Sequence, residues 1–136
     1  MIDKRKFYIN GVWTDPILKY DFEVINPSNE NSYAVISLGS KKDVNSAVNA
    51  AKDAFISWSH FDKKEKIYLL EKLLKIYKRR WNDITHTMSE EMGAPLDWSS
   101  SAQTSSGADH IHDFILRLKD FEFENKFNNK SNNYIL

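Results

Sequence analysis

The chain has 136 residues and no cysteine, which excludes disulfide bonds, cysteine-ligated zinc and a thiol nucleophile from this polypeptide. It also lacks an excess of either charge, because 19 Lys and Arg balance 19 Asp and Glu. Nucleic acids and anionic membrane surfaces favour a basic excess. No apolar run reaches bilayer-spanning length, and residues 1–10 have no apolar core of the kind found in signal peptides. We therefore expect no nucleic-acid partner, no membrane association and a cytoplasmic location.

Glycine and proline are scarce, with four and three residues, so the break at Gly93-Ala94-Pro95 is informative. Gly93 is suited to end a helix in the left-handed conformation, and Pro95 is suited to begin the next one. Helical patterns run on both sides, over 62–88 and 96–121. The first part of the second pattern is rich in serine, a poor helix former. Such a helix usually lies close to another backbone or lines a cavity.

The first forty residues have the pattern of short strands. Asn10-Gly11 lies between two β-prone runs and predicts a tight hairpin over 6–15, because both residues tolerate positive φ. Further strands are predicted at 22–26, which ends in an Asn-Pro turn, and at 33–38. The hydrophobic fraction of 41% and the aromatic fraction of 13% agree with a folded domain.

Two capping signals then open helices. Ser40 is followed three residues later by Asp43, and Asp62 by Glu65, which is the spacing of a capping box. Apolar residues recur at helical spacing after each cap. They are Val44, Ala47, Val48, Ala51, Phe55 and Trp58 after the first, and Ile67, Leu70, Leu73, Leu74, Tyr77, Trp81, Ile84 and Met88 after the second.

The last residues return to β patterning. Strict alternation over 120–124 predicts a strand, 126–133 is an Asn-rich turn region, and 133–136 is the start of another strand. The predicted fold class is α/β, with a β-hairpin and short strands, then three helices, then strands again.

The residues themselves provide no catalytic and no cofactor-binding site. His110 and His112 are two apart, so on a helix they point about 200° away from each other, which disfavours a shared metal. Glu90 and Glu91 are adjacent in sequence, so their carboxylates do not face each other as a pair of acid/base catalysts would. The four glycines are scattered and form no phosphate-binding loop.

The order of motifs nevertheless resembles one family. The segments 7–13 (FYINGVW), 22–27 (FEVINP), 89–96 (SEEMGAPL) and 118–124 (LKDFEFE) are similar to successive segments of the NAD(P)-dependent aldehyde dehydrogenase superfamily. Ala94 stands where that family more commonly has lysine. Each piece is short, but the ordered set covers nearly the whole chain.

The resemblance implies that the chain is the N-terminal part of the aldehyde dehydrogenase fold. Residues 1–119 would be an incomplete segment of the cofactor-binding domain, and 120–136 would begin the strands through which the family forms dimers or tetramers. The family's catalytic cysteine, its general-base glutamate and its dinucleotide site lie downstream of the matched region. We therefore expect an N-terminal fragment that is inactive alone and binds no cofactor alone. The full-length enzyme would oxidise an aldehyde to a carboxylic acid with NAD or NADP. The alternative is a free-standing remnant that acts as a non-catalytic binding or assembly module.

The resemblance also implies two partial sites. Main-chain carbonyls of Val24, Ile25 and Glu91 match segments that bind a structural monovalent cation, Na⁺ or K⁺, in the family. The side chains do not require such a site, because Ile25 fits equally well as a core strand residue and Glu91 as the end of a helix. Ala102 and Ser106 fall on the helix that forms part of the family's substrate tunnel, against the alternative of plain helix packing.

Overall fold

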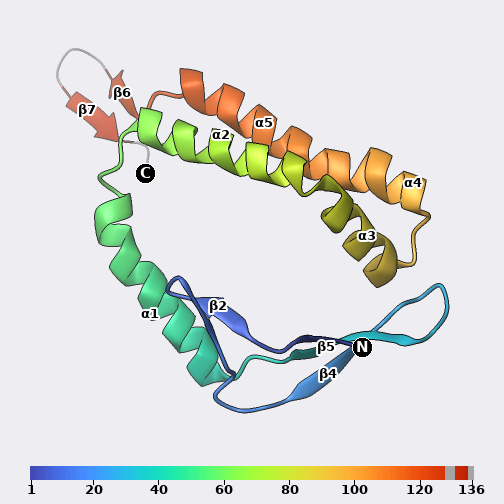
Figure 1. Cartoon of the computed structure of the whole chain (residues 1–136). Helices are drawn as coiled ribbons and strands as arrows, with labels where there is room; N and C mark the ends of the chain where they lie inside the picture. Colours follow the sequence, from blue (N-terminus) through green and yellow to red (C-terminus); the bar gives the residue numbers. More distant parts are fainter. Residues whose placement is uncertain (128–130, 135–136) are drawn as a thin grey trace.

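The computed structural model describes residues 1–127 and 131–134 (Figure 1). Strands come first: β1 (Ile2–Lys4), β2 (Phe7–Ile9), β3 (Val12–Thr14), β4 (Asp21–Ile25) and β5 (Ser32–Ser37). Helices follow: α1 (Lys41–Trp58), α2 (Lys63–Arg79), α3 (Trp81–Met92), α4 (Leu96–Trp98), the π-helix η1 (Ser99–Thr104) and α5 (Ser105–Asp120). The strands β6 (Glu124–Phe127) and β7 (Ser131–Tyr134) close the described part. The predicted α/β class is confirmed.

The Asn-Gly hairpin forms as predicted. Asn10 and Gly11 both have positive φ, 52° and 78°, which gives the turn the twist that two antiparallel strands need. Strand β2 pairs with β3, with Phe7 opposite Thr14 and Ile9 opposite Val12.

The first strand was not predicted. β1 joins β4 and β5 in a sheet of order β1-β5-β4, in which β1 runs parallel and β4 antiparallel to β5. The charged residues Asp3 and Lys4 obscure the strand pattern, and the pairing with β5 over a long sequence separation supplies what local propensity does not. The central strand β5 carries the buried residues Ala34, Val35 and Ser37.

Both predicted capping boxes are present. The Ser40 hydroxyl accepts from the Asp43 amide and the Asp43 carboxylate accepts from the Ser40 amide at the start of α1. Asp62 and Glu65 make the same reciprocal pair at the start of α2. Helix α2 then lies alongside α5, where Ile115 and Leu118 are buried (Figure 1).

The predicted continuous helix over 62–88 is wrong, because the chain turns at Arg80. This residue leaves helical geometry, with φ −96° and ψ 18°. Its amide donates a hydrogen bond that is divided between the carbonyls of Ile76 and Tyr77. The change of direction brings α3 against η1, so a tertiary contact decides where the helix ends. No glycine or proline near Arg80 marks this position.

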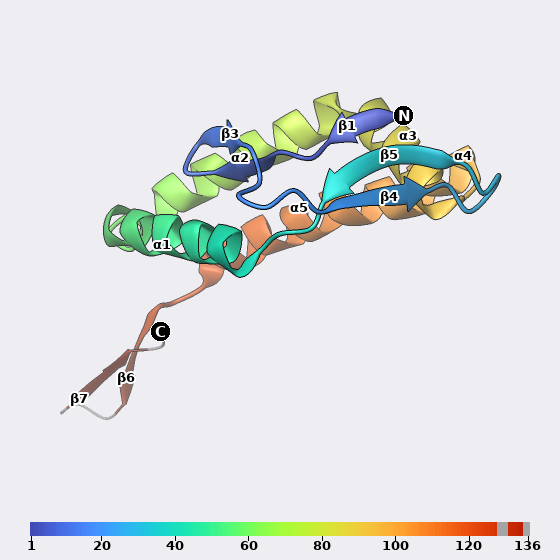
Figure 2. The same cartoon turned by 90° about the horizontal axis from the view of Figure 1, so that it is seen from below.

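The predicted helix over 96–121 is also interrupted. Pro95 precedes it as expected, but residues 99–104 form a π-helix between α4 and α5. The strand predicted at 120–124 begins later, at Glu124, because α5 continues to Asp120. Much of the predicted 126–133 turn is instead strand, with β6 and β7 paired antiparallel and Phe127 opposite Ser131. The β6–β7 hairpin projects from the rest of the chain (Figure 2). Residues 135 and 136 of the predicted last strand lie outside the described residues.

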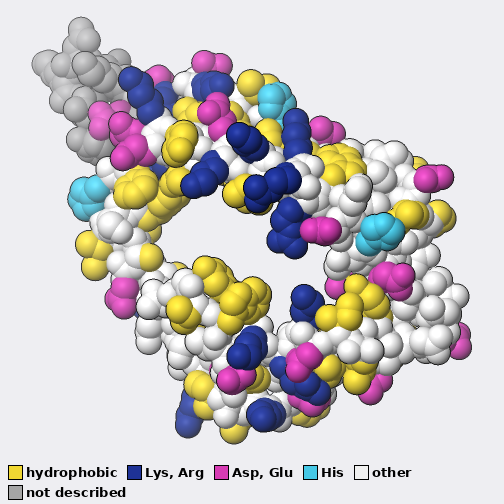
Figure 3. Space-filling view, in the orientation of Figure 1, with side chains coloured by type: hydrophobic (Ala, Val, Ile, Leu, Met, Phe, Trp, Pro, Cys, Tyr) yellow, Lys and Arg dark blue, Asp and Glu magenta, His cyan; other side chains and the backbone are white. Residues whose placement is uncertain are grey.

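The helices and strands surround an opening (Figure 3). Lys and Arg side chains gather along the α2 side of its rim, with apolar side chains between them. Large apolar residues on α1 are exposed, including Phe55 at 63% and Ile56 at 70%. Within residues 1–127 and 131–134, no helix has the length and apolar character needed to cross a membrane.

Candidate functional site

The loop after β4 is joined to the end of α3 through Asn26. This residue is buried, and its side-chain amide donates to the Glu90 carboxylate over 2.7 Å. Its side-chain oxygen accepts from the amide and the hydroxyl of Ser28 at 2.9 and 2.7 Å. One asparagine therefore fixes its own turn and connects that turn to α3.

Gly93 allows the same two segments to come close. It ends α3 with a φ of 67°, as its position before Pro95 predicted. A Cβ atom at Gly93 would lie 3.0 Å from the Ser28 amide nitrogen and 3.3 Å from Pro27 Cβ. The glycine is therefore required both by the backbone conformation and by the close approach of the loop.

The residues predicted to bind a cation lie on these two segments. Val24 and Ile25 end β4 at an irregularity in its pairing with β5, and Glu91 lies in the last turn of α3. The structure brings the segments together through the Asn26–Glu90 hydrogen bond. Main-chain carbonyls suit hard cations, so the chemistry of the donors fits Na⁺ or K⁺.

No group of three or more His, Cys, Asp or Glu side chains in the described part of the chain could hold a metal ion. His110 and His112 are both exposed on α5. The predicted cation site at the β4–α3 corner relies instead on the backbone oxygens of Val24, Ile25 and Glu91.

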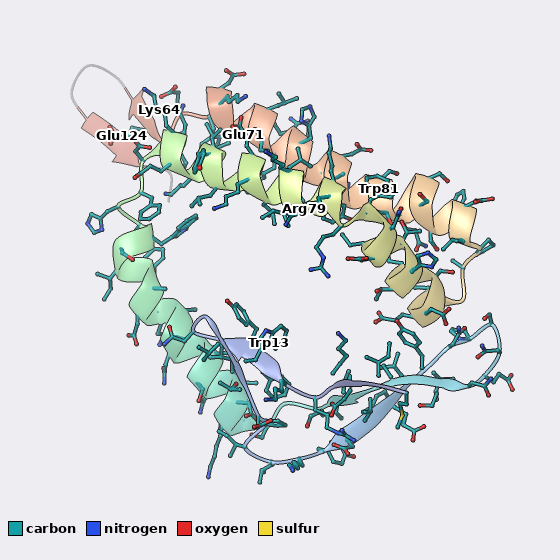
Figure 4. The ribbon with its side chains drawn as sticks, viewed as in Figure 1. Trp13, Lys64, Glu71, Arg79, Trp81 and Glu124 are labelled. Atoms are coloured by element: carbon teal, nitrogen blue, oxygen red, sulfur yellow. The ribbon has the colours of Figure 1, made fainter. Side chains whose placement is uncertain are left out.

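The π-helix η1 is held by side chains from two other helices. The Trp81 side chain of α3 is labelled in Figure 4. Its indole donates to the Ser100 hydroxyl at 2.9 Å. The hydroxyls of Thr85 and Thr104 are 2.9 Å apart in a buried hydrogen bond. The Tyr77 hydroxyl of α2 donates to the Thr104 carbonyl at 3.0 Å. The wide turn is thus fixed at both of its ends.

Serine hydroxyls supply further hydrogen bonds inside this segment. Ser105 donates to the carbonyls of Ser101 and Ala102 at 2.5 and 3.0 Å, and Ser101 donates to that of Asp97 at 2.7 Å. Serine that bonds to the preceding turn commonly bends a helix. The serine-rich stretch therefore forms a π-helix inside a longer helical segment. Its low helix propensity indicated a weak helix but not this form.

Ala102 and Ser106, the predicted tunnel residues, belong to different elements. Ala102 is half-buried within η1, and Ser106 is exposed in the first turn of α5. Two polar atoms of η1, Ser99 Oγ and Gln103 Oε1, are buried with no hydrogen-bond partner among the described residues. Ser99 has an exposed fraction of 0%.

Sequence reasoning missed the residues that shape this segment, namely Tyr77, Trp81, Thr85 and Thr104. Tyr77 and Trp81 were predicted only as part of an apolar stripe. The available signal was the cluster of serines inside a helical pattern, opposite aromatic residues that carry a hydrogen-bond donor. That signal does not specify which carbonyl or hydroxyl accepts the hydrogen bond from each aromatic side chain.

A second buried anchor lies at the start of α1. The Asp43 carboxylate accepts from the Ser40 hydroxyl at 2.6 Å and from the Ile17 amide at 3.0 Å. These hydrogen bonds, the one from the Ser40 hydroxyl above all, lower the pKa of Asp43 below its ordinary value of 3.8. Asp43 thereby ties the loop after β3 to the helix.

Comparison with known proteins shows to which family this chain belongs. The profile of the aldehyde dehydrogenase family matches residues 13–136. The chain belongs to the aldehyde dehydrogenase family. It is 38% identical over 125 residues to a 3-succinoylsemialdehyde-pyridine dehydrogenase of a Pseudomonas species, a match that covers 91% of this chain and 26% of that protein.

Solved structures agree. An aldehyde dehydrogenase from Bartonella henselae superposes with a TM-score of 0.93 at 46% identity, covering 96% of this chain and 28% of the other. AldC from Pseudomonas syringae, solved as a mutant with NAD⁺ and octanal, superposes with a TM-score of 0.88 at 28% identity, covering 90% and 25%. The chain thus has the N-terminal part of the aldehyde dehydrogenase fold and spans about a quarter of the length of these relatives.

Proposed function

We propose that this chain serves as the N-terminal part of an NAD⁺-dependent enzyme that oxidises an aldehyde to a carboxylic acid. The observation that carries the proposal is the match of 96% of the chain to an aldehyde dehydrogenase at a TM-score of 0.93. NAD⁺ is favoured over NADP⁺ because a relative at 28% identity was solved with NAD⁺. The cytoplasmic location expected from the sequence stays a prediction.

In this proposal the catalytic groups come from other parts of the enzyme. A thiol nucleophile is absent from all 136 residues, and covalent capture of an aldehyde by the family's route requires one. The purified chain should therefore form no NADH from a panel of aldehydes, whereas the full-length enzyme should. NADH formation by the chain alone would contradict this division of roles.

The exposed apolar residues favour a fragment over a free-standing module. The chain exposes 10892 Å², whereas a compact monomer of its mass, 15.9 kDa, would expose about 7,400 Å². Uncovered apolar residues on α1 are the expected result when the partner surface belongs to the rest of the same enzyme. We assign 1–119 to the cofactor-binding domain and 120–136, with the β6–β7 hairpin, to the contacts of a homodimer or homotetramer.

For the tunnel, we propose that Ala102 and Ser106 line the path of the aldehyde. Both side chains are small, and Ser106 is exposed in the chain. In the full-length enzyme, Ser106→Trp should lower kcat/KM for a bulky aromatic aldehyde more than for a short linear one, and leave KM for NAD⁺ nearly unchanged. Ser106→Ala is the matched control, since it keeps the volume small. Equal kinetics of Ser106→Trp and wild type for both aldehydes would remove Ser106 from the tunnel wall.

For the cation, we propose that the carbonyls of Val24, Ile25 and Glu91 contribute to a Na⁺ or K⁺ site. The Asn26–Glu90 hydrogen bond supports this because it holds the two segments together. The melting temperature of the full-length enzyme should be higher in NaCl or KCl than in choline chloride at equal ionic strength, since only the small ions fit a carbonyl cage. Identical melting temperatures in all three salts would refute the site.

A further inference from the structure

The π-helical turn is an unusual element that side chains of two other helices help to hold. π-helices occur mostly as single turns inside α-helices, frequently at functional sites. Here the Tyr77 hydroxyl reaches the Thr104 carbonyl, the Trp81 indole reaches Ser100, and Thr85 reaches the Thr104 hydroxyl. Tyr77 lies on α2, and Trp81 and Thr85 lie on α3, after the turn at Arg80.

We propose that Tyr77, Trp81 and Thr85 are positioning residues for the aldehyde path, because they hold η1 in its π-helical form and so set the orientation of Ala102 relative to Ser106. This inference rests on the proposed tunnel role of those two residues. Ala102 lies inside η1 and Ser106 lies beyond it. Since a π-helix has a wider turn than an α-helix, conversion of η1 to α-helix would rotate one residue relative to the other.

The packing around Tyr77 supports this role. A Cβ atom at Gly107 would lie 2.9 Å from Tyr77 Cζ, closer than real Cβ atoms approach a neighbour, so the glycine leaves the space in which the phenol ring lies. The ring also packs edge-on against Trp81, with centroids 6.4 Å apart. Tyr77 is therefore held against η1 by its ring as well as by its hydroxyl.

The external hydrogen bonds pair polar groups of η1 that would otherwise lack partners. Ser99 Oγ and Gln103 Oε1 are already buried without a partner among the described residues. Without the three external hydrogen bonds, the Thr104 carbonyl and the Ser100 hydroxyl would lose partners as well. An α-helical arrangement would then compete with the π-helical one.

Tyr77→Phe in the full-length enzyme tests the inference, because it removes the hydroxyl and keeps the ring. The readout is the ratio of kcat/KM for benzaldehyde to that for propanal. We expect this ratio to change by about 3- to 10-fold, the effect of losing one partly buried hydrogen bond on the geometry of the wall. KM for NAD⁺ should stay within about twofold. Tyr68→Phe is the matched control, since Tyr68 lies exposed on the same helix.

The ratio separates positioning from loss of folded protein. A variant that merely unfolds more easily lowers the rates for both aldehydes in the same proportion, and an unchanged ratio therefore overturns the inference. Ser100→Ala, which removes the acceptor of Trp81, is the second variant and decides the question if Tyr77→Phe does not fold. Its ratio should move in the same direction.

The tunnel role and the positioning role fail in distinguishable ways. If Ser106→Trp changes the aldehyde preference but Tyr77→Phe and Ser100→Ala do not, the tunnel stands and the positioning role is wrong. If Ser106→Trp has no effect, Ser106 is not part of the tunnel wall, and the positioning role, which concerns the orientation of Ala102 relative to Ser106, is wrong with it.

Discussion

Asp43 shows how much one side chain contributes to joining segments of this chain. It is buried at 6% exposure although it is charged, and its oxygens accept from Ser40 and from the Ile17 amide. The capping box was evident from spacing. The hydrogen bond from the Ile17 amide, 26 residues away, was not predicted. The spacing of a capping box does not indicate a second, distant hydrogen-bond partner.

The lowered pKa of Asp43 makes its contribution dependent on pH. Because the pKa in the folded state lies below the ordinary 3.8, the stabilisation is fully present above that value and is lost as the pH falls through the folded pKa. Asp43→Asn should lower the melting temperature at neutral pH, and the difference from wild type should shrink as the pH falls below 3.8. Melting curves over a series of pH values would measure this.

Asp53→Asn is the control for that series, since Asp53 is exposed on the same helix. It should have little effect at any pH. A melting-temperature difference for Asp43→Asn that is constant from neutral to acidic pH would show that its ionisation is not responsible.

Among the elements, the end of α3 is the most constrained. Gly93→Ala should destabilise the protein by about 1–3 kcal/mol, because it places a side chain at positive φ. The added Cβ would also contact Ser28 and Pro27. The midpoint of urea unfolding measures the effect. Gly39→Ala is the control, since its nearest neighbour would be Phe7 Cζ at 3.8 Å and its φ is not positive. Equal effects at the two glycines would contradict the argument.

Elements with a strong local signal were predicted correctly. The Asn10-Gly11 hairpin, both capping boxes and the helix end at Gly93 depend on conformations that particular residues favour, so sequence is sufficient. The turn at Arg80, the π-helix and strand β1 depend on distant partners, namely η1, Tyr77 with Trp81, and β5. Local patterns do not encode such partners.

The strand start was misplaced for a related reason. Alternation over 120–124 indicated a strand, yet Asp120 completes α5. Over five residues, a period of two is too short to outweigh a helix already in progress. The cation and tunnel residues were named through family resemblance alone, and they stay predictions. What the structure adds is the Asn26–Glu90 bond and the π-helix beside them.

At the scale of the whole molecule, uncovered apolar surface should control the behaviour of the isolated chain. Val44, Val48, Phe55 and Ile56 on α1 are all exposed. We expect the purified chain to self-associate, and to do so more strongly as salt screens the repulsion between copies of the acidic residues Asp120, Glu122 and Glu124. Sedimentation velocity at low and high salt would measure this.

Two substitutions on α1 identify the surface responsible. Ile56→Glu should reduce association, because it places a charge on the apolar face. Lys52→Glu, which also changes a charge on the same helix, should reduce it less. A compact monomer at both salt concentrations, for the wild-type chain, would contradict the prediction.

The exposed face of α1 also has a consequence for synthesis in the cell. In the enzyme proposed above, residues 1–136 belong to the N-terminal part, and the relatives they match are about three and a half times as long as this chain. At about 5–20 residues per second, translation of the rest of that proposed enzyme would take tens of seconds. During that time α1 is already able to form, with its cap complete, while nothing yet covers Phe55 and Ile56. This helix is therefore the place where a nascent-chain chaperone would be expected to bind.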